Sequence, residues 1–489
     1  MSSRMQDGLR PPRGRRILSG ALAIAGVIAA LAAWRFVDRR RSDAENEART
    51  GPAIASVPSA DREIYRPSRI PDRIILSWTG DPARSQAVTW RSDAADAPAL
   101  AQITTAEPGP DLAQRAIGVS AVTVPLSSDV GEAHYHTALF EGLAPGTKYA
   151  YRVGDGSTWS EWFQFRTASD APEPFSFVYF GDAQNDIKSL WSRVVREALA
   201  DAPRMAFMLH AGDLVSDSDS DAMWGEWFGA GGWANAMIPS IATPGNHEYN
   251  RSLRFGPKKL TSHWRAQFAL PENGPEGLKE TAYFVDYQGT RIISLDSNIE
   301  QEQQVAWFEH VLSNNPNIWT IVTFHHPLFS SALSRDNAEL RALWKPPIDK
   351  HRVDLILQGH DHTYARTGLD VPEIGAGAER LATPGGTVYV VSVSGPKMYG
   401  LERREYMKRA AEQTQLYQII RIDGPVLRFE ARTANGELYD AFTLKKRPGQ
   451  PNELIEQIPD SPERIADRAR QTKPPNPPVG GSSKTADGR

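Results

Sequence analysis

The sequence predicts an all-β sandwich followed by an α/β domain, and three observations carry this prediction. Residues 68–170 contain short strand-like runs separated by turn residues. Residues 172–446 alternate apolar β-type runs with helical patterns, which is typical of sheets covered by helices. Short polar clusters follow several of these apolar runs, at the place where open α/β sheets bind their ligands.

The composition is that of a globular protein and excludes some kinds of site. A length of 489 residues suggests two or three domains. The formal net charge is −4, so we do not expect nucleic-acid binding, which usually needs a basic chain. The chain has no cysteine, which excludes disulfides, thiolate metal sites and thiol catalysis.

Residues 1–41 form a basic segment that contains an apolar run, Ile17–Trp34, with arginines on both sides. The run is close to the roughly 20 residues of a membrane-spanning helix and exceeds the apolar core of about 7–15 residues in a signal peptide. We therefore favour an uncleaved anchor over a cleaved signal, and expect the protein to be membrane-anchored or exported to the periplasmic or extracellular side. The flanking charges are nearly balanced, which leaves the orientation open. Residues 42–67 are predicted to be a linker.

The predicted sandwich, residues 68–170, begins with two strand-like runs, Ile74–Trp78 and Gln86–Trp90. Later, Leu143-Ala144-Pro145 is followed by Tyr149 at the start of an alternating strand. This arrangement resembles the fibronectin type III sandwich, in which the tyrosine hydroxyl tethers the turn before its strand. No acids or histidines cluster here, so a structural or positioning role is expected.

The α/β domain, residues 172–446, is predicted from buried strands and from helices between them. The apolar runs are Phe175–Phe180, Met205–Leu209, Ile318–Phe324 and Val353–Leu357. The helical candidates are Ile187–Ala200, Gln301–Asn314 and Asn337–Lys350. Further strands are expected within Thr281–Ser297, Gly386–Ser394, Tyr417–Ile422 and Val426–Arg432. Residues 447–489 are rich in proline, glycine and polar residues, and are predicted to be a disordered tail.

Five polar clusters in this domain indicate a metal site. They are Gly181-Asp182, Gly212-Asp213, Gly245-Asn246-His247-Glu248, His325-His326 and Gly359-His360-Asp361-His362. A single Gly-Asp pair is common in turns and says little alone. His360 and His362 are more specific, because residues two apart in an extended segment point to the same side. The carboxylates, amide and imidazoles together could hold two metal ions, and oxygen and nitrogen ligands suit Fe, Mn or Zn.

The order of the clusters, with Val322 three residues before His325, resembles the calcineurin-like metallophosphoesterase superfamily. With the preceding sandwich, the chain is most similar to the purple acid phosphatase family over roughly residues 70–440. The resemblance implies a catalytic domain of two packed sheets flanked by helices, with a dinuclear metal centre at the sheet edge. It also implies the metal ligands: Asp213 bridging both ions, Asp182 and His362 on the first, and Asn246, His325 and His360 on the second.

The same resemblance implies the reaction. A metal-bound hydroxide would attack phosphorus, and His247 would approach the phosphate and protonate the leaving group, so His247 and Asp213 are the expected catalytic residues. The chain departs from the family at Ser216, where purple acid phosphatases have the tyrosine that colours the iron centre. Gln184 stands where many relatives have a histidine. Either it is a ligand of the first metal, or it only hydrogen-bonds a ligand or water.

Other polar residues near the clusters are candidates of lower specificity. His326 and Arg366 could bind substrate, although Arg366 could equally be a paired arginine, and His210 is expected to be a core residue. The expected function is hydrolysis of phosphomonoesters, small-molecule substrates, by an acid phosphatase-like enzyme. The alternatives are a phosphodiesterase or nucleotidase on the same centre, or a surface adhesion protein with a degenerate catalytic domain. The sequence leaves the substrate, the metals and the oligomeric state open.

Overall fold

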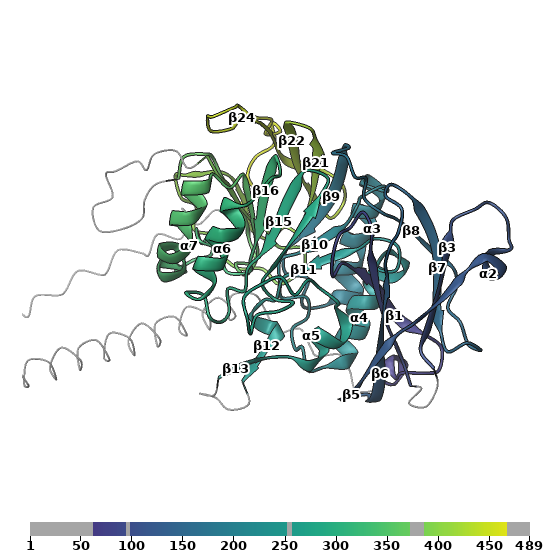
Figure 1. Ribbon diagram of the computed structural model, residues 1–489. Helices are drawn as coiled ribbons and strands as arrows, with labels where there is room; N and C mark the ends of the chain where they lie inside the picture. The colour runs from purple at the N-terminus through teal and green to yellow at the C-terminus, as the bar shows by residue number, and fades with distance from the viewer. Residues whose placement is uncertain (1–61, 94–97, 252–256, 372–385, 467–489) are drawn as a thin grey trace, which may run out of the picture.

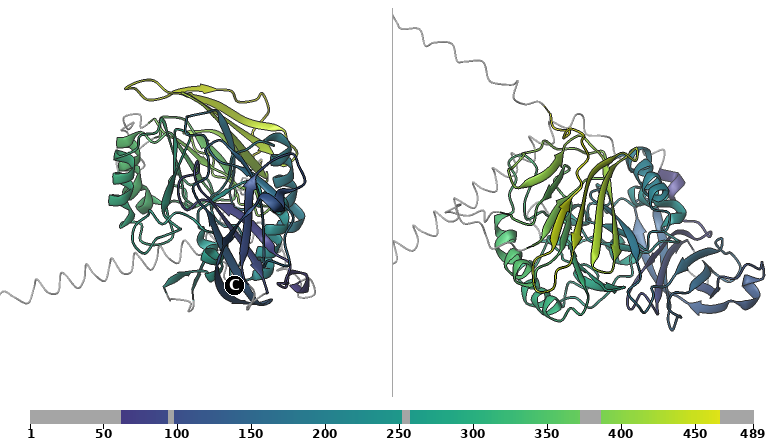
Figure 2. Two further views of the ribbon diagram at one scale, coloured as in Figure 1. Left: turned by 45° about the vertical axis from the view of Figure 1, so that its right-hand side comes forward. Right: turned by 90° about the horizontal axis from the view of Figure 1, so that it is seen from above.

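The computed structural model describes residues 62–93, 98–251, 257–371 and 386–466. Two β-rich layers at the N-terminal side pack against a larger domain built from two further sheets (Figures 1 and 2). The apolar run Ile17–Trp34 lies outside the described residues. None of the helices in the described part of the chain has the length and apolar composition that crossing a bilayer requires.

The N-terminal domain is a sandwich of two four-stranded antiparallel sheets. One sheet has the order β1 (Asp72–Ser77), β2 (Gln86–Ser92), β6 (Gly131–Phe140), β5 (Val122–Ser128). The other has the order β4 (Ile117–Ser120), β3 (Leu100–Thr105), β7 (Lys148–Gly154), β8 (Phe163–Arg166), with a short helix α2 (Leu112–Arg115) between β3 and β4. Leu76, Trp90 and Tyr151 are among the side chains that fill the space between the sheets.

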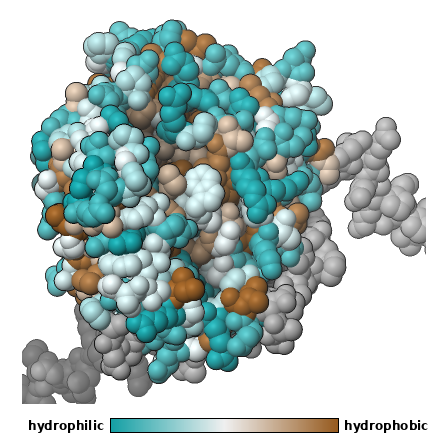
Figure 3. All heavy atoms as spheres, turned by 90° about the vertical axis from the view of Figure 1, so that its right-hand side faces the viewer, coloured by the Kyte–Doolittle hydropathy of each residue, from teal (hydrophilic) through white to brown (hydrophobic). Residues whose placement is uncertain are grey.

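The turn before β7 has the tether that its sequence predicts. The hydroxyl of Tyr149 accepts a hydrogen bond from the backbone N–H of Ala144, at 2.8 Å. Figure 3 faces the side of the molecule that carries the two N-terminal sheets, and hydrophilic and intermediate residues cover most of that face. Val122, Val124 and Leu139 are apolar side chains of β5 and β6 that remain exposed.

The second domain contains two seven-stranded mixed sheets. The first has the order β11 (Ser240–Ala242), β10 (Met208–His210), β9 (Phe175–Phe180), β21 (Leu416–Asp423), β22 (Val426–Thr433), β23 (Leu438–Lys445), β24 (Glu453–Glu456). The second has the order β14 (Tyr283–Tyr287), β15 (Thr290–Ser294), β16 (Trp319–Thr323), β17 (Leu355–Gln358), β19 (Val388–Val391), β18 (Tyr364–Thr367), β20 (Met407–Ala411). A separate small hairpin joins β12 (Tyr249–Arg251) to β13 (Lys258–Leu260).

The second sheet buries both of its faces, which explains its nearly continuous apolar strands. Ile321 and Leu355 belong to the large core between the sheets. Their neighbours Val322 and Ile356 point the other way, into a smaller core under two helices. Because successive side chains of a strand alternate between faces, each apolar pair supplies both cores.

Helices lie on two opposite sides of the pair of sheets, as Figure 2 shows. Helices α6 (Gln304–Ser313) and α7 (Ala338–His351) pack together over the smaller core. On the other side lie η2 (Ile187–Trp191), α3 (Ser192–Asp201) and α4 (Asp221–Gly231), followed by η3 (Gly232–Ala234). The remaining short helices are η1 (Arg62–Tyr65), η4 (Asn246–Glu248) and α5 (Ser262–Gln267). The three predicted helices are thus present, with ends shifted by a few residues.

The structure corrects the predicted linker and tail at their inner ends. The linker ends in η1, where the carbonyl of Tyr65 accepts a hydrogen bond from Arg91 at 2.9 Å. The prediction of disorder from residue 447 is wrong for the described residues 447–466, because β24 pairs with β23 and Leu454 packs against the main core. Composition indicated disorder there, but a four-residue strand at a sheet edge needs few apolar side chains. Residues 467–489 lie outside the described residues.

Candidate metal centre

The predicted ligands follow the carboxyl ends of parallel strands in both sheets. Asp182, Asp213 and Asn246 come after β9, β10 and β11, which run parallel in the first sheet. His325 and His360 follow β16 and β17, which run parallel in the second sheet. The loops of the two sheets meet, and the polar side chains gather where they meet.

Two glycines allow these loops to touch. Gly212 has φ +91°, and a Cβ atom on it would lie 2.6 Å from the backbone nitrogen of Gly245 and 2.7 Å from Nδ1 of His325. A Cβ on Gly245 would lie 2.2 Å from Oδ1 of Asp213. Any side chain at either position would push the loops apart, so the glycines of these two motifs are required by close backbone approach.

Three predicted ligands have left-handed backbone conformations. The φ angles are +51° for Asp213, +75° for His360 and +48° for His362. Residues other than glycine rarely adopt this region, and each such residue costs of order 1–3 kcal/mol. The surrounding contacts hold all three in place, which is the pattern expected at a functional site.

Two groups of ligand atoms share one carboxylate. Asp182, Asp213 and His362 form the first group, and Asp213, His325 and His360 form the second. Within each group the ligand atoms lie within 4.8 Å of one another. The side-chain oxygen of Asn246 lies 3.1 Å from Nε2 of His325, so the amide joins the second group. The structure therefore brings together all six residues predicted as ligands.

Backbone carbonyls fix the orientation of two imidazoles. Nδ1 of His325 lies 2.9 Å from the carbonyl of Ala211, and Nδ1 of His362 lies 2.8 Å from the carbonyl of Lys397. A carbonyl only accepts hydrogen bonds, so both Nδ1 atoms carry hydrogen. Each ring therefore turns its Nε2 atom toward the carboxylates of the cluster. Histidine ligands of metals are typically held in this way.

Charges in the cluster also suit a cation. Burial lowers the pKa of His360 and of His362 well below the usual range, so both rings are neutral and able to act as ligands. Burial alone would raise the pKa of Asp213, but His325 and His247 lower it below the usual range and keep the carboxylate charged. Burial opposes charge on His325 too, yet Asp213 raises its pKa to about 9. A bound metal ion would replace that proton.

Gln184 lies beside the first group and is fully buried. Its Nε2 atom donates to Oδ2 of Asp213 at 2.9 Å and lies 3.1 Å from Nε2 of His362. Its Oε1 atom and Oδ1 of Asp182 are buried oxygens without a hydrogen-bond partner. The unpaired Oδ1 of Asp182, which belongs to the first group, fits the binding of a cation, since buried oxygens are otherwise nearly always paired.

His247 lies at the edge of the cluster and keeps 29% of its side chain exposed. Its backbone N–H donates to Oδ1 of Asp213 at 2.9 Å. Its Nδ1 atom lies 2.5 Å from the carbonyl of Ser216, so Nδ1 carries hydrogen and Nε2 is the free ring atom. Nε2 lies 3.9 Å from Oδ2 of Asp213.

The three other polar residues that the sequence singled out have different surroundings in the structure. His326 is half-buried, with its ring 4.3 Å from that of His360, and stays a candidate for substrate binding. Arg366 is fully buried and its guanidinium binds Asp440 and Glu456, which matches the alternative of a paired arginine. His210 is a core residue, as predicted, between the rings of Phe180 and Trp227.

Glu248 is a residue whose role the sequence did not indicate. Its carboxylate accepts three backbone hydrogen bonds, from Gly245 at 2.7 Å and from Asp213 and Leu214 at 2.9 Å each. Glu248 thereby joins the loop of Asp213 to the loop of Asn246. The sequence feature that could have indicated this role is the place of Glu248 directly after Asn246 and His247 in the cluster.

Comparison with known proteins agrees with this arrangement. Residues 71–167 match the family model "Purple acid Phosphatase, N-terminal domain", and residues 175–364 match "Calcineurin-like phosphoesterase". The chain is a calcineurin-like phosphoesterase with a purple acid phosphatase N-terminal domain. This confirms the predicted family, fold and enzyme class.

Individual relatives of this phosphoesterase are distant. It is 27% identical over 334 residues to acid phosphatase type 7 of Homo sapiens, which covers 61% of this chain and 71% of the human protein. It is 24% identical over 248 residues to Fe(3+)-Zn(2+) purple acid phosphatase 12 of Arabidopsis thaliana, covering 48% and 52%. The structure of a purple acid phosphatase from Lupinus luteus seeds superposes with a TM-score of 0.64 at 18% identity, covering 78% of this chain and 75% of the lupin chain, and supports the fold alone.

Proposed function

We propose that this phosphoesterase hydrolyses phosphomonoesters with two metal ions held by the clustered ligands. The observation that carries the proposal is the sharing of Asp213 between two groups of ligand atoms. A shared carboxylate places two ions close together, and such a pair would activate a water molecule and neutralise the charge of the phosphate. The oxygen and nitrogen ligands suit Fe, Mn or Zn, and one relative is named for iron and zinc.

Side chains of the cluster would supply the other parts of the reaction, namely proton donation and contact with the phosphate. In its protonated form, His247 would donate the Nε2 proton to the oxygen of the leaving group, because Nδ1 is held by the Ser216 carbonyl and the ring lies at the exposed edge of the cluster. The Ser216 carbonyl would hold the ring with Nε2 facing the substrate. His326, half-buried beside His360, would contact the phosphate.

Metal analysis of the purified chain together with a phosphoester panel tests this proposal. We expect about two metal ions per chain and turnover of a chromogenic phosphomonoester. Asp213→Asn and Asn246→Ala should each lower kcat by more than about 100-fold, since residues that merely orient metal ligands already contribute about 10–100-fold. Glu272→Gln, an exposed carboxylate paired with Lys279, is the control and should stay active.

Other outcomes of the same panel contradict the proposal in different ways. Faster turnover of diesters or nucleotides than of monoesters would favour the phosphodiesterase or nucleotidase alternative. A chain that binds both metals and cleaves no ester would favour the adhesion protein with a degenerate catalytic domain.

We also propose that the protein acts at a membrane or after export. The support is the arginine-flanked apolar run Ile17–Trp34. Cell fractionation of the full chain should place it in the membrane or exported fraction. Recovery of the intact chain in the cytoplasmic fraction would contradict this.

A further inference from the structure

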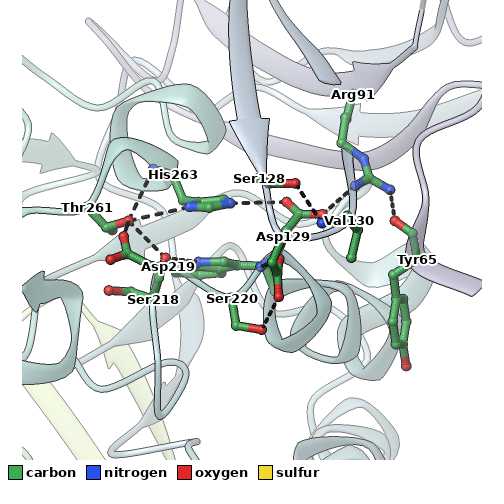
Figure 4. Close-up of polar contacts among 12 residues, drawn as sticks. Tyr65, Arg91, Ser128, Asp129, Val130, Ser218, Asp219, Ser220, Thr261 and His263 are labelled. Atoms are coloured by element: carbon green, nitrogen blue, oxygen red, sulfur yellow. Dashed lines mark hydrogen bonds and ion pairs between the residues drawn. The ribbon is translucent and has the colours of Figure 1, made fainter. Parts of the chain in front are cut away.

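A short loop connects the bridging carboxylate to the N-terminal domain. Asp213 begins this loop, and α4 begins only eight residues later, at Asp221. The N-terminal domain holds the far end. Asp129, in the turn between β5 and β6, accepts hydrogen bonds from Oγ of Ser220 at 3.0 Å and from the N–H of Asp221 at 2.7 Å (Figure 4).

The side chain of Asp221 provides a second attachment of the loop's end to the N-terminal domain. It is fully buried and its carboxylate pairs with Arg73 at 2.6 Å and with Arg91 at 2.7 Å, both from strands of the N-terminal domain. Nε2 of His263 lies 3.2 Å from the same carboxylate. These contacts are strong because they are charged and buried. The start of α4 therefore cannot shift without breaking these contacts with the N-terminal domain.

The middle of the loop is tied as well. The carbonyl of Ser218 accepts hydrogen bonds from Oγ1 of Thr261 at 2.8 Å and from Nε1 of Trp224 at 3.0 Å. Two residues earlier lies the carbonyl of Ser216, which holds Nδ1 of His247. The contacts of the N-terminal domain and the contact that orients His247 are thus four residues apart.

We propose that the N-terminal domain positions His247 for proton transfer to the leaving group. Asp129 and Asp221 are the positioning residues, and they act through the loop and the Ser216 carbonyl. The inference rests on the proposed function and adds to it a role for a domain whose described residues contain no group of metal ligands. Displacement of a catalytic group by about 1 Å can cost about 100-fold in rate, so a tied loop has a measurable effect.

Two phosphomonoesters of similar size separate positioning from stability. 4-Nitrophenyl phosphate has a leaving group that departs without a proton, whereas benzyl phosphate releases an alkoxide that needs one. General acid catalysis contributes about 10²–10⁴-fold where it is needed. In Asp129→Ala we expect kcat for benzyl phosphate to fall about 10-fold more than kcat for 4-nitrophenyl phosphate, with KM and metal content unchanged. Ser220→Ala, which removes only the hydroxyl contact, should show a smaller change in the same direction.

The matched control is Tyr151→Phe. The hydroxyl of Tyr151 donates to the carbonyl of Ala236 at 2.6 Å, which is also a buried contact between the two domains but lies away from the loop. This variant should lose stability and keep the wild-type ratio of the two kcat values. Equal losses on both substrates in Asp129→Ala, or the same ratio change in Tyr151→Phe, would overturn the inference.

Failure of the proposed function is distinguishable from failure of the inference. If the wild-type protein cleaves neither ester, the proposed function fails, and hydrogen exchange then decides the inference. Backbone exchange at residues 214–220 and 246–248 should increase in Asp129→Ala and not in Tyr151→Phe. Unchanged exchange in Asp129→Ala would contradict the positioning role.

Discussion

The side-chain amide of Gln184 lies beside the metal-ligand cluster, and its nitrogen and oxygen have different surroundings. Its Nε2 atom lies near Asp213 and His362, while its Oε1 atom is buried without a hydrogen-bond partner. The two ends of an amide are exchanged by a 180° turn of the side chain, which needs no change in shape. After that turn the oxygen would face the first ligand group. The turned side chain would add an oxygen ligand to those that Asp182, Asp213 and His362 would offer to a bound metal ion.

Removal of this amide should be visible in the metal itself. In Gln184→Ala we expect the first ion to bind about 10–100-fold more weakly. X-ray absorption spectroscopy should count one oxygen ligand fewer on the bound metal, because a direct ligand is lost. Gln184→Glu keeps an oxygen and should retain the wild-type ligand number. Weaker binding with an unchanged ligand number in Gln184→Ala would show that Gln184 only hydrogen-bonds its neighbours.

At the scale of elements, the strands and the ligands at their ends could be predicted together. Strands such as β16 and β17 are apolar on both faces, and the ligands follow them at once, so one pattern indicates both. The orienting groups could not be predicted. The carbonyls of Ser216, Ala211 and Lys397 each hold a ring, and a backbone carbonyl carries no signal in the sequence.

The edge strand β24 shows another limit of prediction from sequence. Its backbone pairs with β23, and its Glu456 binds the buried guanidinium of Arg366. Arg366 lies 90 residues earlier in the chain, and its pairing with Asp440 and Glu456 depends on tertiary structure alone. The position of Arg366 shortly after the two histidines suggested a substrate contact. In the structure its guanidinium instead links the two sheets of the second domain.

At the scale of the whole molecule, the two domains are joined by buried charge. Burial alone would raise the pKa of Asp221, but the hydrogen bond from His263 and the charges of the two arginines lower it below the usual range. A carboxyl whose pKa is lower in the folded than in the unfolded state stabilises the fold above its unfolded pKa, about 3.9. That contribution disappears as the pH falls through the folded pKa.

The replacement Asp221→Asn should reveal this contribution. At pH 7 we expect the free energy of unfolding to fall by about 3–5 kcal/mol, because two buried arginines lose their charged partner. The difference from wild type should shrink as the pH falls below about 4, where protonation begins to remove the advantage of the carboxylate. Denaturant titration at both pH values measures it, with the exposed Asp170→Asn as control. A difference independent of pH would contradict the assignment.

The sheet order also has a consequence for synthesis of the chain on the ribosome. Strand β9, in the middle of the first sheet, pairs with β10, which follows soon after, and with β21, which emerges more than 200 residues later. Until then one edge of β9 has no native partner, and an unpaired apolar edge favours aggregation. Completion of this sheet must wait for nearly the whole described chain. A chain that ends before β21 would therefore leave this edge of β9 open to pairing with other chains.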